Sequence, residues 1–185
     1  LALELSRKTK GAISAIRDLG LHCKRVSGGL PVLISPWIDG EKAVMASAAA
    51  LKKPTAVSLE THAQEWNEIF KGIQGAVDIV AFQDGHVAYE QLRSYLEVNK
   101  KLADQYGLVS WTNTESFDRD MPIKFLPNKC DKLQYKLAQA AAVGMEKAIT
   151  FECSHFMSPQ SAYKQAGHLY QRYTDYYLNL NTQNP

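Results

Sequence analysis

The sequence predicts a parallel α/β fold, and two observations lead to this prediction. Four short apolar segments typical of buried strands are separated by segments that are long and periodic enough to form helices. Each apolar segment is followed by a loop and then by a helix, so the chain consists of one helix and four βα units, the alternation expected of a parallel sheet. The four segments cover residues 30–34, 77–82, 108–114 and 148–152.

Composition limits the kinds of protein to which such a sheet can belong. A chain of 185 residues that is 45% hydrophobic can bury one sizeable core, so we expect a single domain or part of one. The 21 Lys and Arg residues are spread along the chain and the net charge is +2, which argues against a nucleic-acid partner. The longest apolar run, residues 43–51, is half the length that a bilayer requires, so no membrane span is predicted. Cys23, Cys130 and Cys153 lack the spacing of a zinc site or a disulfide framework, and we predict neither a metal nor a cofactor.

The chain is predicted to open with an amphipathic helix and a strand. Residues 3–19 carry apolar side chains at helical spacing, and Gly20 is expected to end this helix. Residues 30–34 form a continuous apolar run of the kind found in parallel strands that are covered on both faces, and Pro36 stops it. Residues 37–57 lose this pattern, and we interpret them as a long loop, a feature often associated with function.

The remaining βα units follow the same plan. A helix capped by Ser58 or Thr61 precedes the second strand, and the third strand is rich in β-branched and aromatic residues, which favour strands. After the fourth strand, Ser158 and Pro159 supply a favoured start for the last helix. The predicted elements are helices from 58 or 61 to 75, over 89–106, over 128–143 and from 158, a loop over 116–127, and a loose tail over 179–185, so that residues 1–178 form the domain.

Polar and aromatic side chains gather where the four strands end. Alternation places Trp111, Asn113 and Glu115 on one face of the third strand, and a carboxylate on such a face is unusual for a packed core. In parallel α/β folds, ligands bind outside the carboxyl ends of the strands. We therefore predict a site formed by Trp37, Gln83, Asp84, Trp111, Asn113, Glu115, Glu152 and His155.

These residues also have structural explanations. Glu115 could accept hydrogen bonds from backbone N–H groups or pair with Arg119, and Glu152 could pair with a lysine. Trp111 could belong to the core, and Asp84 before a glycine forms an ordinary turn pair. The remaining candidates are interpreted as surface or helix residues (His22, His62, His168) or as packing residues of the last helix (Tyr163, Tyr170, Tyr173, Tyr176, Tyr177).

Two parallel architectures fit this alternation, a doubly wound sheet and a closed barrel. No strand exit contains G-x-G-x-x-G or G-x-x-x-x-G-K-[ST], so the phosphate-binding loop of a dinucleotide or nucleotide site is missing. The exits instead combine tryptophan with amides and carboxylates. This combination suits sugars, because their C–H faces stack on aromatic rings and their hydroxyls need several polar partners. A carbohydrate substrate is therefore predicted.

Three segments resemble the DUF4434 family of glycoside-hydrolase-like (β/α)8 barrels, namely PVLISPWIDG, VDIVAFQDG and LVSWTNTESF. The resemblance covers about residues 1–178. It implies a TIM barrel of which this chain provides strands five to eight, with residues 3–19 as the fourth helix. The missing N-terminal half of the barrel, or a partner chain, is then expected to complete the sheet. A periplasmic or extracellular location is implied by the same resemblance.

The resemblance also implies a mechanism. Many retaining glycosidases of this fold carry the acid/base at the end of strand four and the nucleophile at the end of strand seven, and Glu115 falls on strand seven. Carboxyl groups about 5 Å apart support retention, and a separation of about 6.5 to 9.5 Å supports inversion. Glu115 is thus the candidate nucleophile or base, its acid/base partner is expected upstream of Leu1, and the other seven residues are expected to bind substrate.

Two classes of function stay open at this point. The first is a glycoside hydrolase acting on a poly- or oligosaccharide, and the second is a non-catalytic glycan-binding barrel. They differ in whether a second carboxylate faces Glu115. A third class, an aldolase or phosphate-binding barrel, requires a reactive lysine at a strand end or a Gly-rich loop after the last strands, and the sequence shows neither.

Overall fold

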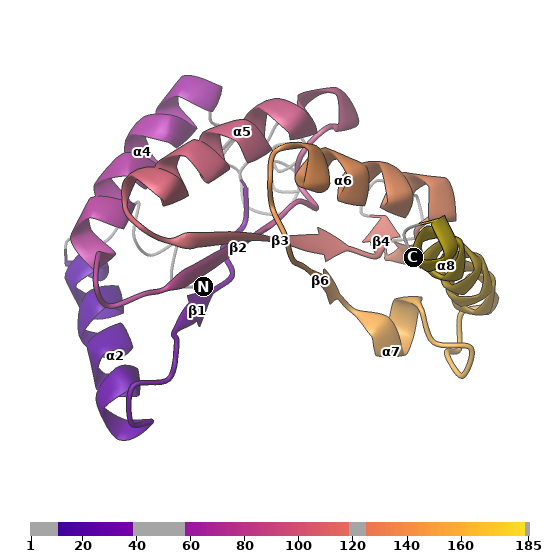
Figure 1. The fold of residues 1–185 in the computed structure, drawn as a ribbon, viewed down its shortest axis with the longest axis horizontal. Coiled ribbons are helices and arrows are strands. Elements are labelled where there is room, and N and C mark those ends of the chain that lie inside the picture. The colour runs from indigo at the N-terminus through magenta and orange to yellow at the C-terminus, as the bar shows by residue number, and fades with distance from the viewer. Residues whose placement is uncertain (1–10, 39–57, 119–124, 184–185) are drawn as a thin grey trace, which may run out of the picture.

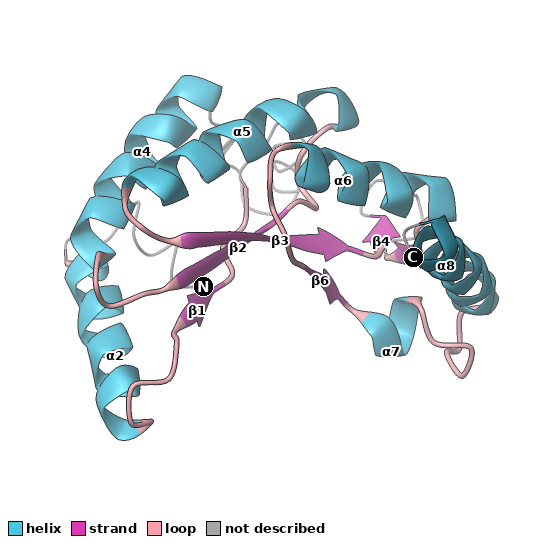
Figure 2. Cartoon of the chain, viewed as in Figure 1, coloured by secondary structure: helices cyan, strands magenta, loops and turns pink. Residues whose placement is uncertain are grey.

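A computed structural model of the chain describes residues 11–38, 58–118 and 125–183. Helices and strands alternate along these residues (Figure 1, Figure 2), and no helix among them is both long and apolar enough to cross a bilayer. The order is α2 (Ala12–Val26), β1 (Leu33–Ile34), α4 (Leu59–Ile73), β2 (Ile79–Gln83), α5 (Tyr89–Gln105), β3 (Val109–Glu115), β4 (Phe117–Asp118), β5 (Leu126–Pro127), α6 (Cys130–Ala142), β6 (Ala148–Phe151), α7 (Cys153–Phe156) and α8 (Lys164–Gln183).

The main sheet has four parallel strands in the order β1-β2-β3-β6. Its register pairs Gln83 of β2 with Asn113 of β3, and Glu115 of β3 with Phe151 of β6. Parallel neighbours need crossover connections, which α4, α5 and α6 provide. The predicted α/β class with a parallel sheet is therefore confirmed. The predicted loop after β3 also contains a small antiparallel pair, β4 with β5, that was not expected.

Helices α4, α5 and α6 cover one face of the sheet (Figure 1). Val80 and Phe82 of β2 belong to the buried core on this face, and the Trp66 ring of α4 lies 4.7 Å from that of Phe82 between centroids. Alternate residues of the same strands point to the opposite face. There Val109 and Phe151 are 52% and 51% exposed, so the described part of the chain leaves apolar surface open to solvent.

Helix α2 does not end at Gly20, and this prediction was wrong. The helix continues to Val26, with Gly20 buried inside it. A Cβ at this position would lie 2.5 Å from the backbone carbonyl oxygen of Ala76. Gly20 is therefore a close-packing residue rather than a helix cap. Residues 3–10 of the predicted helix lie outside the described part of the chain.

The first strand is shorter than predicted, but pairing with β2 does not stop at Pro36. Gln83 N–H donates to the Pro36 carbonyl at 2.7 Å, and Ile38 N–H donates to the Gln83 carbonyl at 3.1 Å. A proline loses only its own N–H, so its carbonyl still accepts from the neighbouring strand. This pairing holds Trp37 beside Gln83 at the carboxyl end of β2. The predicted loop beyond it, residues 39–57, lies outside the described residues.

Helix α4 begins as one of the two predicted alternatives and buries a histidine. Ser58 is the cap, because its hydroxyl accepts from Thr61 N–H at 3.1 Å. His62 was interpreted as a surface or helix residue, and it is a fully buried helix residue whose Nε2 lies 2.6 Å from Asn99 Oδ1 of α5. Aromatic rings of Trp66, Phe82 and Tyr95 surround it.

The C-terminal helix begins later than predicted. Ser158 does not start it, because its hydroxyl accepts from Gln160 N–H at 3.1 Å in a local turn that competes with helix. Helix α8 begins at Lys164 and runs to Gln183, so most of the predicted loose tail is helical. The short helix α7, directly after β6, was not predicted.

Candidate functional site

Three predicted site residues lie side by side at the carboxyl ends of β1, β2 and β3. Asn113 Nδ2 reaches across β2 and donates to Ser35 Oγ at 2.8 Å. Gln83 Nε2 donates to the Ser35 carbonyl at 2.8 Å, and Trp37 Nε1 donates to Gln83 Oε1 at 2.5 Å. Trp37, Gln83 and Asn113 are thus joined through Ser35 into one polar edge.

This edge contains an acceptor that the described chain does not satisfy. Asn113 is 6% exposed, and its Oδ1 has no hydrogen-bond partner among the described residues. Buried acceptors normally have one. A donor such as a sugar hydroxyl could complete this site.

Two tryptophans are close to the same edge. Trp37 is 45% exposed, and its ring meets that of His86 edge-on at 5.2 Å between centroids. Trp111 is half-buried, and Lys147 Nζ lies 5.1 Å from the centre of its ring. The register places Trp111 two residues before Asn113 and on the same face of β3.

The Glu115 carboxylate lies against Gly85, in the turn after β2. Glu115 is 1% exposed, at the last position of β3. A Cβ added to Gly85 would lie 1.7 Å from Glu115 Oε2 and 2.5 Å from Oε1. The glycine therefore leaves the space that the carboxylate occupies. A glycine at the end of the QDG segment and a glutamate on the next strand therefore fit together sterically, because any larger residue than Gly85 would overlap the Glu115 carboxylate.

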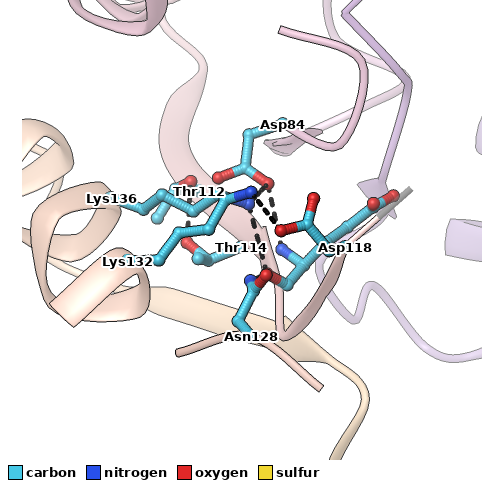
Figure 3. A network of polar contacts seen from close by, with 8 residues as sticks. Asp84, Thr112, Thr114, Asp118, Asn128, Lys132 and Lys136 are labelled. Atoms are coloured by element: carbon cyan, nitrogen blue, oxygen red, sulfur yellow. Dashed lines mark hydrogen bonds and ion pairs between the residues drawn. The ribbon is translucent and has the colours of Figure 1, made fainter. Parts of the chain in front are cut away.

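Asp84 points away from the Trp37–Gln83–Asn113 edge, toward the helices. Its Oδ1 accepts from Lys136 Nζ of α6 at 3.0 Å and from the Glu115 N–H at 3.0 Å. Burial raises the pKa of the Asp84 carboxyl, and the ammonium of Lys136 and the Glu115 N–H oppose that rise by stabilising the ionised form. Figure 3 shows Lys136 and Lys132 approaching Asp84 and Asp118 from α6.

Glu152 and His155 contact each other after the end of β6. Glu152 Oε1 accepts from the backbone N–H of His155 at 3.0 Å and also meets its Nδ1, and Ser154 Oγ donates to Oε2. These contacts lower the pKa of Glu152, the Ser154 hydroxyl most of all. The predicted alternative of a lysine partner is thus replaced by serine and histidine. Ser116 Oγ donates to the Glu152 carbonyl at 3.1 Å and ties this segment to the end of β3.

Four participants were missed by sequence reasoning. Ser35 was named only within the segment PVLISPWIDG, and Asn128, whose Nδ2 donates to the Glu115 carbonyl at 2.8 Å, was interpreted only as the first residue of a helix. Gly85 was read only as part of a turn. Lys136 did leave a signal, because it falls in the buried stripe of α6 at helical spacing with Leu133 and Ala140, where an unpaired lysine would be costly.

Metal binding has no visible basis in the described residues. Within residues 11–38, 58–118 and 125–183, no three His, Cys, Asp or Glu side chains are arranged to hold a metal ion.

The chain belongs to the DUF4434 family, described as a domain of unknown function, whose model matches residues 4–163. The predicted family resemblance is therefore confirmed. No curated protein sequence matches the chain at a significant level.

The fold is shared with a solved structure of a protein from Bacteroides thetaiotaomicron VPI-5482 that carries the description of a putative alpha-L-fucosidase. The two chains are 61% identical, with a TM-score of 0.83. The match covers 90% of this chain and 50% of the other, so this chain spans about half the length of that protein.

Proposed function

We propose that the protein is a glycoside hydrolase acting on a poly- or oligosaccharide, with Glu115 as nucleophile or base. The observation that carries this proposal is the placement of Glu115. Its carboxylate is buried at the carboxyl end of a parallel strand, in space left by Gly85, beside an edge of amide and indole groups. Polar groups at the carboxyl ends of parallel strands lie where α/β folds of this kind bind ligands and place catalytic residues. The 61% identity to a protein whose description names an alpha-L-fucosidase supports the same class.

The proposed reaction uses two carboxyl groups. One protonates the leaving oxygen of the glycosidic bond, while Glu115 either attacks the anomeric carbon or activates a water. We assign the second carboxyl group to a strand outside residues 1–185, as the family resemblance implies. The relative at 61% identity is about twice as long, which leaves room for such a strand.

The proposed function includes a proposed architecture for the sheet. We infer that β1, β2, β3 and β6 are strands five to eight of a (β/α)8 barrel. In support, helices α4, α5 and α6 all cover one face of the sheet (Figure 1), while apolar Val109 and Phe151 on the other face are 52% and 51% exposed. Side chains in that position would fill the interior of a closed barrel.

The sugar subsite is proposed to lie along the Trp37–Gln83–Asn113 edge. Asn113 Oδ1 would accept from a hydroxyl, and the exposed Trp37 ring would offer a stacking face. Trp111, Glu152 and His155 are proposed as further substrate contacts. Glu152 and His155 contribute from the end of the next strand, where the His155 side chain is 74% exposed.

A second candidate function is glycan binding without hydrolysis. One observation favours it: Glu115 is 1% exposed, whereas Trp37 is 45% exposed. In the described part of the chain, the Trp37 ring is therefore accessible for stacking on a sugar, whereas the Glu115 carboxylate is shielded from water.

Two variants of the full-length protein separate these candidates. Glu115→Gln should abolish hydrolysis and leave binding largely intact, because the amide keeps the shape of the side chain but cannot act as a nucleophile or base. Trp111→Ala should weaken binding first. The measurement is turnover of α-L-fucosides and a wider glycan panel, with calorimetric binding alongside. Near-normal turnover by Glu115→Gln would refute the assignment, and binding without cleavage by the native protein would favour the binding module.

A further inference from the structure

Three segments of the chain converge on the backbone of Glu115. Its N–H donates to Asp84 Oδ1 at 3.0 Å, directly after β2. Its carbonyl accepts from Asn128 Nδ2 at 2.8 Å, ahead of α6, and from Lys136 Nζ at 3.2 Å, within α6. The backbone N–H and the carbonyl of Glu115 are therefore both held by side chains, in addition to the pairing of β3 with its neighbouring strands. Figure 3 shows Asp84, Asn128 and Lys136, the three residues that supply these side chains.

Lys136 and Asp84 form a buried ion pair. Their side chains are 8% and 1% exposed, and the Nζ to Oδ1 distance is 3.0 Å. An apolar pair of similar volume is often as stable as a buried ion pair, because removing two charges from water is costly. The stability of the fold is therefore a weak reason for a charged pair at this position. The contacts of Asp84 and Lys136 with the Glu115 backbone provide a second reason for the pair.

We propose that Asp84 and Asn128 are positioning residues, which hold the N–H and the carbonyl of Glu115 and thereby direct its carboxylate into the space beside Gly85, while Lys136 compensates the buried charge of Asp84. This inference rests on the proposed function. It gives Asp84 a different role from the sugar contact predicted from sequence. Gln83 points to the polar edge, and the next residue points to the helix layer, where Lys136 meets it.

The chain offers a matched control on the same helix. Lys132, one turn before Lys136, pairs with Asp118 at 2.7 Å, whereas the side-chain contacts to the Glu115 backbone described above come from Asp84, Asn128 and Lys136. Lys132→Met therefore removes an ion pair between α6 and the region after β3 without touching the proposed positioning contacts.

Two double variants of the full-length protein isolate the Asp84 oxygen. Asp84→Asn/Lys136→Met and Asp84→Leu/Lys136→Met both remove the buried charges and have similar shapes, but only asparagine keeps an acceptor for the Glu115 N–H. Equal melting temperatures would show that the two cores are comparable. We expect the leucine variant to have a kcat about 100-fold below that of the asparagine variant, since misplacing a reacting group by about 1 Å can cost that much. KM should change little, and Lys132→Met should match the native enzyme.

Crystal structures of the two double variants test the geometry independently of turnover. We expect the Glu115 carboxylate to stay beside Gly85 with asparagine and to move away with leucine. If the leucine variant does not fold, Asn128→Ala provides the test, because it removes one donor to the Glu115 carbonyl without leaving a buried charge. It should lower kcat and leave KM unchanged.

The two proposals can fail separately. If the native protein cleaves no glycan, the proposed function is wrong, and the crystal structures alone decide the positioning role. An unmoved carboxylate in the leucine variant, or kcat values equal in both double variants, would overturn that role and leave the ion pair as a purely structural feature.

Discussion

Replacing Gly85 with alanine places a methyl group where the Glu115 carboxylate now lies. The added Cβ would be 1.7 Å from Oε2 and 2.1 Å from Cδ, whereas ordinary contacts begin at 3.4 Å. The carboxylate would have to retreat by about 1.7 Å, unless the turn after β2 moves instead. Either movement separates Glu115 from the position that the native chain gives it.

The size of the effect follows from this displacement. A misplacement of about 1 Å can cost about 100-fold in rate, so Gly85→Ala should lower kcat of the full-length protein by at least that factor, or about 2.7 kcal/mol in activation free energy. Overpacking of this kind also lowers the free energy of unfolding, by about 1–3 kcal/mol. The melting temperature should fall with it, by at most about 2–4 °C for each kcal/mol, because the full-length protein is larger than this chain.

The assay is turnover of the best substrate from the glycan panel, with melting temperature measured in parallel. Gly167→Ala in α8 is the control, because its Cβ would meet only Pro159 Cα at an ordinary 3.8 Å; turnover should be unchanged and stability equal or slightly higher. Native turnover and native melting temperature in Gly85→Ala would refute the packing described for Glu115. A destabilised variant with native turnover would leave the packing intact and remove its link to catalysis.

Two further predictions concern stability and assembly. The hydrogen bond from Lys24, and then that from Val32 N–H, hold the pKa of Asp78 below its ordinary value of 3.8; a lowered pKa stabilises the fold above the unfolded pKa, and that contribution is lost as pH falls through the folded pKa. Asp78→Asn should therefore lower the free energy of unfolding by about 0.2–1 kcal/mol at neutral pH, because the Lys24–Asp78 pair is partly exposed. In acid well below pH 3.8, the substitution should have no effect on that free energy. Urea unfolding at both pH values measures the difference, and an equal loss at both would contradict this prediction. As an isolated fragment, residues 1–185 should associate, because β1 and β6 are the edge strands of the described sheet and unpaired edges invite pairing. A monodisperse monomer in light scattering would contradict that expectation.

The elements of the fold were largely predictable from the sequence because their signals are local. Apolar runs and helical spacing identified each strand of the main sheet and each crossover helix. The errors arose where long-range contacts or local turns overrode those signals. Gly20 looks like a helix end in the sequence, and only the neighbouring carbonyl of Ala76 explains why the helix passes through it. Ser158 and Pro159 look like a helix start, but local hydrogen bonding makes a turn of them.

The candidate site was predictable in position more than in detail. The rule that functional residues lie at the carboxyl ends of parallel strands grouped Gln83 with Asn113, and the register of the sheet pairs these two residues. It could not reveal that Asp84 is buried against Lys136, which lies 52 residues later in the chain. Nor could it reveal Ser35, whose backbone carbonyl and hydroxyl join Gln83 to Asn113.

Chemical rescue of Glu115→Ala tests the central claim most directly. Removing the carboxylate opens space at the reacting centre, and azide is a small anion that can enter it and attack the sugar in place of the missing nucleophile or activated water. We predict that Glu115→Ala of the full-length protein loses hydrolysis of an activated glycoside of the sugar that the native protein cleaves best, and that added azide restores turnover and yields the glycosyl azide, while azide has no such effect on Trp111→Ala. Retained hydrolysis in Glu115→Ala without azide, or loss of hydrolysis that azide does not restore at any concentration, would contradict the assignment of Glu115 as the catalytic carboxylate.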